Sequence, residues 1–105
     1  MDINLIITKI SSGISAVAPF GEKYLYGSRA RGDAREDSDY DVLVLLPDNL
    51  SSIAFVKWRR KISDILFDIG IENGVEISLA CYKKQQWENR NSVFSYNVNL
   101  DKISI

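Results

Sequence analysis

Apolar residues recur at helical spacing in two long stretches of the chain. The first covers residues 2–18 and predicts an amphipathic helix. The second follows Ser51 or Ser52, either of which can cap a helix, and is expected to reach about Ile69, where Gly70 would stop it. The apolar positions are Ile3, Ile6, Ile7, Ile10, Ile14 and Val17 in the first stretch and Trp58, Ile62, Ile65, Leu66 and Ile69 in the second.

Three shorter segments have the composition of β-strands. Residues 24–26 are aromatic and apolar, and residues 42–46 form an unbroken apolar run that predicts a central strand buried on both faces. Residues 74–82 alternate, with Val75, Ile77, Leu79 and Cys81 on one face and Glu76, Ser78, Ala80 and Tyr82 on the other.

The remaining elements complete a simple order along the chain. A helical turn is expected at residues 29–31 and a short helix at residues 83–89, while residues 91–105 carry no clear pattern. The order is helix, strand, turn-helix, strand, helix, strand, helix. It predicts one α/β (α+β) domain over residues 1–105, with a small mixed β-sheet flanked by helices.

Composition narrows the function classes. Of the 105 residues, 46% are hydrophobic and 26% charged, which is ordinary for a soluble globular protein, and the net charge of −1 predicts no strong nucleic-acid binding. The absence of histidine excludes Ser-His-Asp triads and imidazole zinc sites. The single cysteine, the lack of a secretory signal and the lack of a long apolar run predict a cytoplasmic protein without a membrane span.

A cluster of basic residues in the second long helix leaves two interpretations open. A solvated face is favoured, and a docking surface for an acidic partner or RNA is the alternative. The cluster consists of Lys57, Arg59, Arg60 and Lys61.

Candidate chemistry begins at the Gly27-Ser28 pair, directly after the first predicted strand. Glycine lets a ligand approach the backbone closely, and N–H groups at a helix start attract phosphates. Arg29, Arg31 and Arg35 add guanidinium groups that suit phosphate oxygens. Taken alone, the pair favours an ordinary strand-to-helix turn with solvated arginines, because such pairs are common. A triphosphate-binding turn is the functional interpretation, and it gains support from the carboxylates that follow.

Asp39 and Asp41 lie at or just before the start of the predicted central strand. If the strand extends back that far, its period of two puts both on one face, with Cα atoms about 6.5–7 Å apart. Two carboxylates so close repel one another unless a cation lies between them, and hard oxygen ligands suit Mg²⁺ or Mn²⁺. The pair predicts a metal site; an acidic loop facing water is the alternative.

Glu76 is a third carboxylate, flanked by apolar residues in the last predicted strand. A lone charge there must be exposed, paired or liganded. It is interpreted as a third metal ligand that also takes the proton from an attacking hydroxyl, against the simpler alternative of a solvent-facing glutamate.

Three other ligand sites are excluded by the sequence. The spacing of Gly27 and Gly32 is that of a P-loop, but Asp33 stands where lysine is required, and no strand is followed by G-x-G-x-x-G. A calcium loop starting at Asp37 would need glycine at its sixth position, where the chain has Val42.

Gly-Ser, ten residues, Asp-x-Asp and a later apolar-acid-apolar strand together resemble the DNA polymerase β-like nucleotidyltransferase superfamily. The chain looks like its minimal nucleotidyltransferases, which are found beside HEPN-domain proteins in prokaryotic toxin–antitoxin pairs. By matching position, the resemblance implies triphosphate binding by Gly27 and Ser28, metal binding by Asp39 and Asp41, and the third acid at Glu76, where many relatives have aspartate. The tail lacks the Glu-Gly pair that often closes such chains, so no role carries over there.

The resemblance implies a function as well. It predicts two Mg²⁺ or Mn²⁺ ions, ATP as donor, and transfer of AMP to a hydroxyl, with a tyrosine of a cognate HEPN toxin as the expected acceptor and the chain acting as antitoxin. Such a partner predicts a hetero-oligomer, with a homo-oligomer as a further possibility. Two alternatives stay open: a non-catalytic module that masks its partner by contact, and a nucleotidyltransferase acting on a small molecule.

Overall fold

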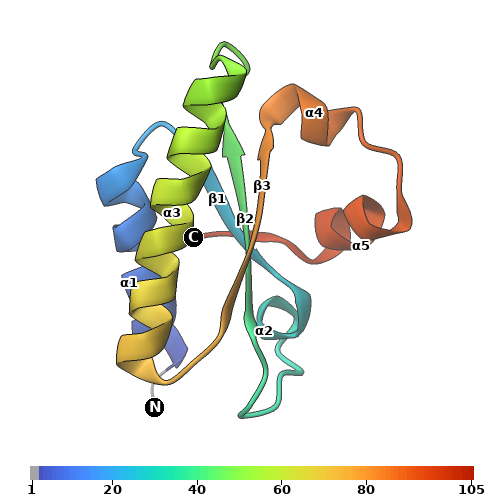
Figure 1. Ribbon diagram of the computed structural model, residues 1–105. Helices are drawn as coiled ribbons and strands as arrows, with labels where there is room; N and C mark the ends of the chain where they lie inside the picture. The colour runs from blue at the N-terminus through green and yellow to red at the C-terminus, as the bar shows by residue number, and fades with distance from the viewer. Residues whose placement is uncertain (1–2) are drawn as a thin grey trace.

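The computed structural model describes the backbone of residues 3–105 and the side chains of residues 5–105. Its elements in chain order are α1 (Ile3–Val17), β1 (Glu22–Tyr26), α2 (Gly27–Arg31), β2 (Tyr40–Leu46), α3 (Ser52–Asn73), β3 (Ile77–Lys83), α4 (Lys84–Glu88), α5 (Val93–Asp101) and β4 (Ile103–Ser104) (Figure 1). The predicted order of elements is confirmed, and α5 and β4 are added in the region that had no clear pattern.

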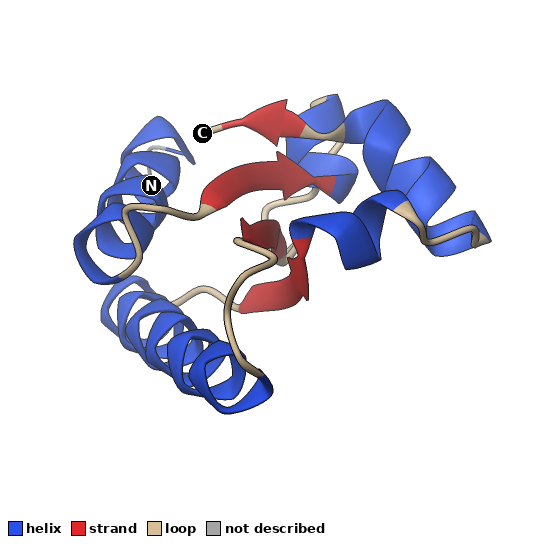
Figure 2. Cartoon of the chain, turned by 90° about the horizontal axis from the view of Figure 1, so that it is seen from above, coloured by secondary structure: helices blue, strands red, loops and turns tan. Residues whose placement is uncertain are grey.

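The four strands form one mixed sheet in the order β3-β2-β1-β4. β1 is antiparallel to both β2 and β4, whereas β2 and β3 are parallel. The long helices α1 and α3 lie on one side of the sheet, and the shorter helices lie on the other (Figure 2). The predicted small mixed sheet flanked by helices is therefore confirmed.

Two apolar clusters on opposite faces of β2 hold these layers together, because residues 42–46 of this strand are all buried. The helix pair α1 and α3 covers one face, and Trp87 of α4 and Val98 of α5 pack against Leu43 and Leu45 on the other. The predicted stripes of both long helices point into the first cluster, with Ile6, Ile10, Ile14, Ile62, Leu66 and Ile69 buried. The side chain of Ile3 lies outside the described residues.

The prediction that Gly70 ends the second long helix is wrong. α3 begins with Ser51 as its cap, continues through Gly70 to Asn73, and ends at Gly74, which adopts a left-handed conformation with φ of 65°. A Cβ atom at Gly70 would lie 2.7 Å from the carbonyl oxygen of Val75, so this glycine lets the chain pass close to the helix. Because Gly74 caps the helix, β3 also begins later than predicted, at Ile77.

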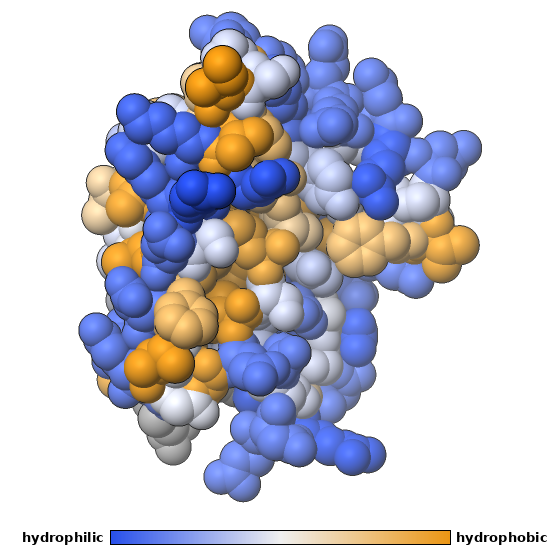
Figure 3. All heavy atoms as spheres, viewed as in Figure 1, coloured by the Kyte–Doolittle hydropathy of each residue, from blue (hydrophilic) through white to orange (hydrophobic). Residues whose placement is uncertain are grey.

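Apolar side chains reach the surface along α3 (Figure 3). Ile53, Phe67 and Ile71 are exposed, and part of this face borders a hollow of about 530 Å³ between α3 and the edge strand β3. Ile77 and Leu79 line the hollow and belong to the sheet face that α1 and α3 cover. No helix in the described part of the chain is both long and apolar enough to cross a membrane.

Candidate active site

The Gly27-Ser28 turn lies where β1 passes directly into α2. Gly27 has a φ of 72°, a left-handed conformation that glycine adopts readily. A Cβ atom at this position would collide with a carboxylate oxygen of Asp41. The bare backbone of the turn and the carboxylate of Asp41 therefore lie directly against one another, as a site that joins phosphate and metal binding requires.

The end of α2 is equally tight. Gly32, with φ of 83°, and Asp33 donate their N–H groups to the carbonyl oxygen of Ser28 at 3.0 and 3.2 Å. These bonds close the turn over residues 27–31, so the predicted helical turn is confirmed and begins two residues earlier than expected.

The aspartate pair lies at the start of β2, as predicted. Asp41 is aligned with Tyr26 of β1 on one side and with Ser78 of β3 on the other. Asp39 immediately precedes the strand. Because strand side chains alternate, Asp41 lies on the sheet face that carries α4 and α5.

Electrostatics support a cation at this pair. Burial, followed by the negative charge of Asp39, raises the pKa of Asp41, while the positive charge of Arg31 opposes this rise. Neither aspartate side chain makes a hydrogen bond or ion pair within residues 5–105. Two neighbouring carboxylates, one half-buried and both unpaired, repel one another, and a divalent cation bound between them would relieve this repulsion.

Burial and the charge of Asp41 also act on the neighbouring residue Tyr26. Its pKa is raised to about 12 by burial, then by the charge of Asp41 and by Tyr82. The phenol therefore stays protonated beside the aspartate and serves as a neutral wall of the site.

Glu76 immediately precedes β3, as Asp39 immediately precedes β2, and the N–H of Tyr40 donates to the Glu76 carbonyl oxygen at 2.9 Å. Its side chain is exposed and shares with Asp39 an open hollow of about 520 Å³, which Asp41 does not line. No group of three or more acidic, cysteine or histidine side chains within the described residues is arranged to hold a metal ion. The structure thus places Asp39 and Asp41 at the start of β2 and Glu76 beside Asp39. The roles of all three as metal ligands stay predictions.

Arg29 supports the loop before the aspartates. Its Nη2 donates to the carbonyl oxygens of Glu36 and Ser38 at 3.1 and 2.8 Å, and its guanidinium carbon lies 4.5 Å from the centre of the Tyr40 ring. Its Nε is buried and has no partner in the region that the structure describes. These contacts hold the loop against β2; binding of nucleotide by Arg29 stays a prediction.

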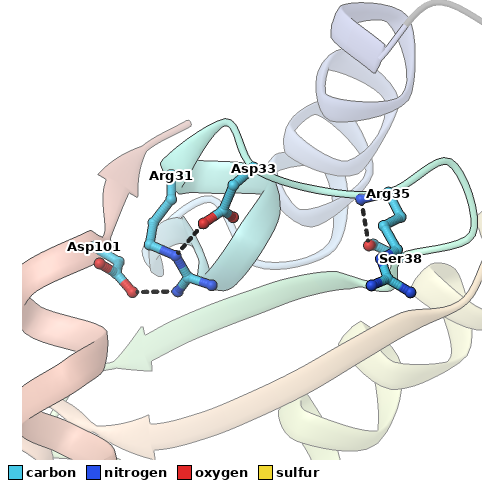
Figure 4. A network of polar contacts seen from close by, with 5 residues as sticks. All are labelled: Arg31, Asp33, Arg35, Ser38 and Asp101. Atoms are coloured by element: carbon cyan, nitrogen blue, oxygen red, sulfur yellow. Dashed lines mark hydrogen bonds and ion pairs between the residues drawn. The ribbon is translucent and has the colours of Figure 1, made fainter.

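Arg31 extends from the end of α2 to two carboxylates (Figure 4). Its Nε lies 3.2 Å from Asp33, and its Nη1 lies 2.7 Å from Asp101. Nearby, the backbone N–H of Arg35 donates to the hydroxyl of Ser38 at 2.8 Å, which shapes the loop that leads to Asp39.

Asp101 is a contact of Arg31 that the sequence pattern does not single out. It is the last residue of α5 and lies 70 positions from Arg31 along the chain. No local motif marks it, because its importance arises only from the contact that the fold creates.

Comparison with known proteins gives the family of this chain. Residues 21–103 match the family described as "Polymerase beta, Nucleotidyltransferase". A protein of Methanocaldococcus jannaschii described as a "putative protein adenylyltransferase" is 34% identical over 86 residues, which are 80% of this chain and 83% of that protein.

Solved structures share the fold. A "putative minimal nucleotidyltransferase" superposes with a TM-score of 0.65 and 21% identity, covering 100% of this chain and 97% of that one. A toxin–antitoxin structure with AMP-PNP superposes with a TM-score of 0.58 and 20% identity, covering 99% of this chain and 72% of that one. A complex of tri-AMPylated HEPN toxin from Shewanella oneidensis with MNT antitoxin superposes with a TM-score of 0.59 and 19% identity, covering 96% of this chain and 69% of that one.

The matched region contains the Gly27-Ser28 turn, both aspartates and Glu76. The resemblance inferred from these motifs is confirmed at the level of family and fold. The chain belongs to the polymerase β nucleotidyltransferase family.

Proposed function

We propose that this protein transfers AMP from ATP to a protein hydroxyl, a tyrosine of a cognate HEPN toxin, and thereby acts as its antitoxin. The observation that carries the proposal is the Asp39–Asp41 pair, which has no protein partner in the described residues and whose Asp41 carboxylate lies directly against the glycine turn at the start of α2. The similar protein of M. jannaschii bears the name of an adenylyltransferase, and the structural neighbours include an AMPylated HEPN toxin with MNT antitoxin.

Asp39 and Asp41 are the residues that would hold Mg²⁺ or Mn²⁺, with Glu76 as the third acid and room in this donor set for two ions. When bound, the metal neutralises phosphate charge and lowers the pKa of the acceptor hydroxyl. The fit rests on hard carboxylate oxygens of the aspartate pair, which have no protein partner of their own in the described residues.

The protein groups act on the nucleotide and the acceptor. The N–H groups of the Gly27-Ser28 turn and the guanidinium of Arg31 bind the triphosphate, and Glu76 accepts the proton of the acceptor hydroxyl. The acceptor oxygen then bonds to the α-phosphorus while the bond to the β-phosphate oxygen breaks, so that pyrophosphate leaves. Alignment of these groups supplies most of the rate acceleration.

Co-expression with the cognate toxin tests the proposal. Intact-mass measurement should find the toxin heavier by one or more AMP units when the wild-type protein is present. The Asp39→Asn/Asp41→Asn variant should add no mass. The matched control is Asp64→Asn/Asp68→Asn, which removes two exposed aspartates of α3 and should leave the mass gain unchanged.

Two results would contradict the proposal. If the Asp39→Asn/Asp41→Asn variant still neutralises the toxin and no mass is added by either protein, masking by contact is the function. If wild-type protein consumes ATP and labels a small molecule in place of the toxin, the acceptor is wrong. The predicted cytoplasmic location and hetero-oligomeric state belong to the same proposal.

A further inference from the structure

The C-terminal helix contacts the active-site turn through an ion pair. Arg31, the last residue of α2, donates from Nη1 to the carboxylate of Asp101, the last residue of α5, at 2.7 Å (Figure 4). The helices α2 and α5 also pack against one another. A residue far along the chain thus holds a side chain that belongs to the triphosphate turn.

The two carboxylates around Arg31 are not equivalent. The Asp101 side chain is 21% exposed and contacts Arg31 at 2.7 Å, whereas Asp33 is 62% exposed and contacts it at 3.2 Å. Solvent screens an exposed pair strongly, and a shorter, less exposed contact is stronger. Asp101 is therefore the stronger of the two partners.

Asp101 is itself held in place from both sides. The N–H of Lys102 donates to the carbonyl oxygen of Val98 at 2.8 Å, which closes the end of α5. The next two residues form β4, which pairs with Tyr24 and Leu25 of β1. Because β1 leads directly into Gly27, the carboxylate of Asp101 and the triphosphate turn are anchored to the same strand.

This arrangement leaves one nitrogen of the guanidinium free. Asp33 takes Nε and Asp101 takes Nη1, while Nη2 has no hydrogen-bond partner among residues 5–105. The Arg31 side chain is 46% exposed, and its positive charge reaches Asp41. A fixed guanidinium with one free nitrogen, whose charge acts on Asp41, can bind a phosphate oxygen without losing its protein contacts.

We propose that Asp101 is a positioning residue, which fixes the guanidinium of Arg31 so that its free Nη2 donates to the triphosphate of the bound nucleotide. The inference rests on the proposed nucleotide binding at this site. It assigns a role to the C-terminal segment, which supplies the orientation of Arg31 and makes no contact with the reacting atoms.

A double-mutant cycle in nucleotide affinity tests the proposal. Calorimetry would measure binding of ATP with Mg²⁺, and of inorganic tripolyphosphate with Mg²⁺, to the purified protein. Asp101→Asn is expected to weaken both ligands by about tenfold, the scale of one charge-assisted hydrogen bond. In an Arg31→Gln background, the same substitution is expected to change neither affinity.

Three comparisons separate positioning from a merely structural role. Asp101→Glu keeps the charge and is expected to recover part of the affinity, and Asp33→Asn, at the more exposed partner, is expected to cost less than Asp101→Asn. Thermal unfolding of each variant is measured alongside. A folding defect would instead weaken binding equally in the wild-type and Arg31→Gln backgrounds and would follow the loss in Tm.

The proposal is overturned if Asp101→Asn binds ATP as tightly as wild type, if it binds more tightly, or if its loss is the same in both backgrounds. Tighter binding would mean that Asp101 competes with phosphate for Arg31. The AMP-transfer assay is independent of this cycle. If the wild-type protein adds no AMP to the toxin but Asp101 and Arg31 show the expected coupling in nucleotide affinity, the positioning role stands and only the proposed acceptor is wrong.

Discussion

At the scale of single residues, the missing side chain of Gly27 makes the site possible. The Asp41 carboxylate lies against the turn in the space that a side chain at this position would fill. Any such side chain would therefore disturb the turn and the Asp41 carboxylate together. Gly32, at the other end of α2, shares the left-handed conformation but has open space around it.

These two glycines provide a matched pair of substitutions. Gly27→Ala is expected to reduce ATP affinity at least about tenfold, because the new Cβ displaces the Asp41 carboxylate as well as straining the backbone. Gly32→Ala should carry only the backbone strain, of about 1 kcal/mol in the free energy of unfolding. Calorimetry and denaturant unfolding measure the two effects. Equal ATP affinities for the two variants would show that the collision with Asp41 does not matter.

The proposed role of Glu76 as a proton acceptor can be tested by substitution. If it takes the proton of the acceptor hydroxyl, Glu76→Gln should lower kcat by about 100-fold or more while ATP affinity changes little. Glu72→Gln, an exposed glutamate near the end of α3, is the control for the lost charge. Turnover that is the same in both variants would identify Glu76 as a solvent-facing residue just before the edge strand β3.

At the scale of elements, α3 joins the scaffold to the site. Its apolar stripe packs on the sheet, and its last turn lies beside the hollow that Asp39 and Glu76 share. Gly70 lies near this end of the helix and is buried, because the backbone at Val75 passes over it on the way to β3. The position of Glu76 is therefore set by how closely the connection can approach the helix.

Gly70→Ala is expected to destabilise the protein, contrary to the usual gain of about 1 kcal/mol for this change inside a helix. The new Cβ would meet a backbone carbonyl oxygen at 2.7 Å, and relief of such a clash costs about 1–3 kcal/mol. Gly13→Ala in α1 is the control, since its Cβ would meet mainly the flexible end of Ile69 at 2.9 Å. Denaturant unfolding compares them; a Gly70→Ala protein as stable as Gly13→Ala would contradict the expected clash.

At the scale of the whole molecule, the site lies where three parts of the chain meet. The β1–α2 turn, the start of β2 and the end of α5 surround it, and the strands β1 and β2 hold all three in register. The two long helices cover the face of the sheet opposite Asp41 and contribute the larger apolar cluster. The larger apolar cluster thus lies on one side of the sheet, and the other side combines a smaller apolar cluster with the unpaired carboxylate of Asp41.

The unpaired charge should have a measurable effect on stability. Because burial and the Asp39 charge raise the pKa of Asp41, the folded protein holds this proton more tightly than the unfolded chain does. In metal-free protein, protonated Asp41 therefore stabilises the fold at a pH below its unfolded-state pKa of about 3.9. This stabilisation is lost as the pH rises through the higher pKa that Asp41 has in the folded protein. Asp41→Asn should therefore raise the Tm of chelator-treated protein at pH 7 and have little effect at about pH 3.

Asp68→Asn, which changes an exposed aspartate of α3, is the control and should shift Tm at neither pH. Addition of Mg²⁺ and ATP should raise the Tm of wild type and not that of Asp41→Asn, because ligand binding stabilises only the form that can hold it. An Asp41→Asn protein that melts below wild type at pH 7 without metal would mean that the carboxylate contributes to folding.

Local patterns were sufficient for much of the site. The glycine turn, the aspartate pair and the buried strand that follows them are close in sequence, and turn chemistry and strand period act over a few residues. The same holds for the stripes of α1 and α3, which follow from helical spacing alone. The prediction at Gly70 was wrong because glycine is both a helix stop and a close-packing residue, and only the neighbouring chain distinguishes these uses.

The sequence by itself determined the family, the types of the elements, and the residues Gly27, Ser28, Asp39 and Asp41 as candidates for chemistry, because local patterns in a few short segments carry this information. The tertiary structure decided which of these side chains meet. It placed Arg29 on the loop carbonyls, set Glu76 beside Asp39, and brought Asp101 to Arg31. Contacts between residues far apart in the chain depend on strand order and packing, and no local pattern encodes them.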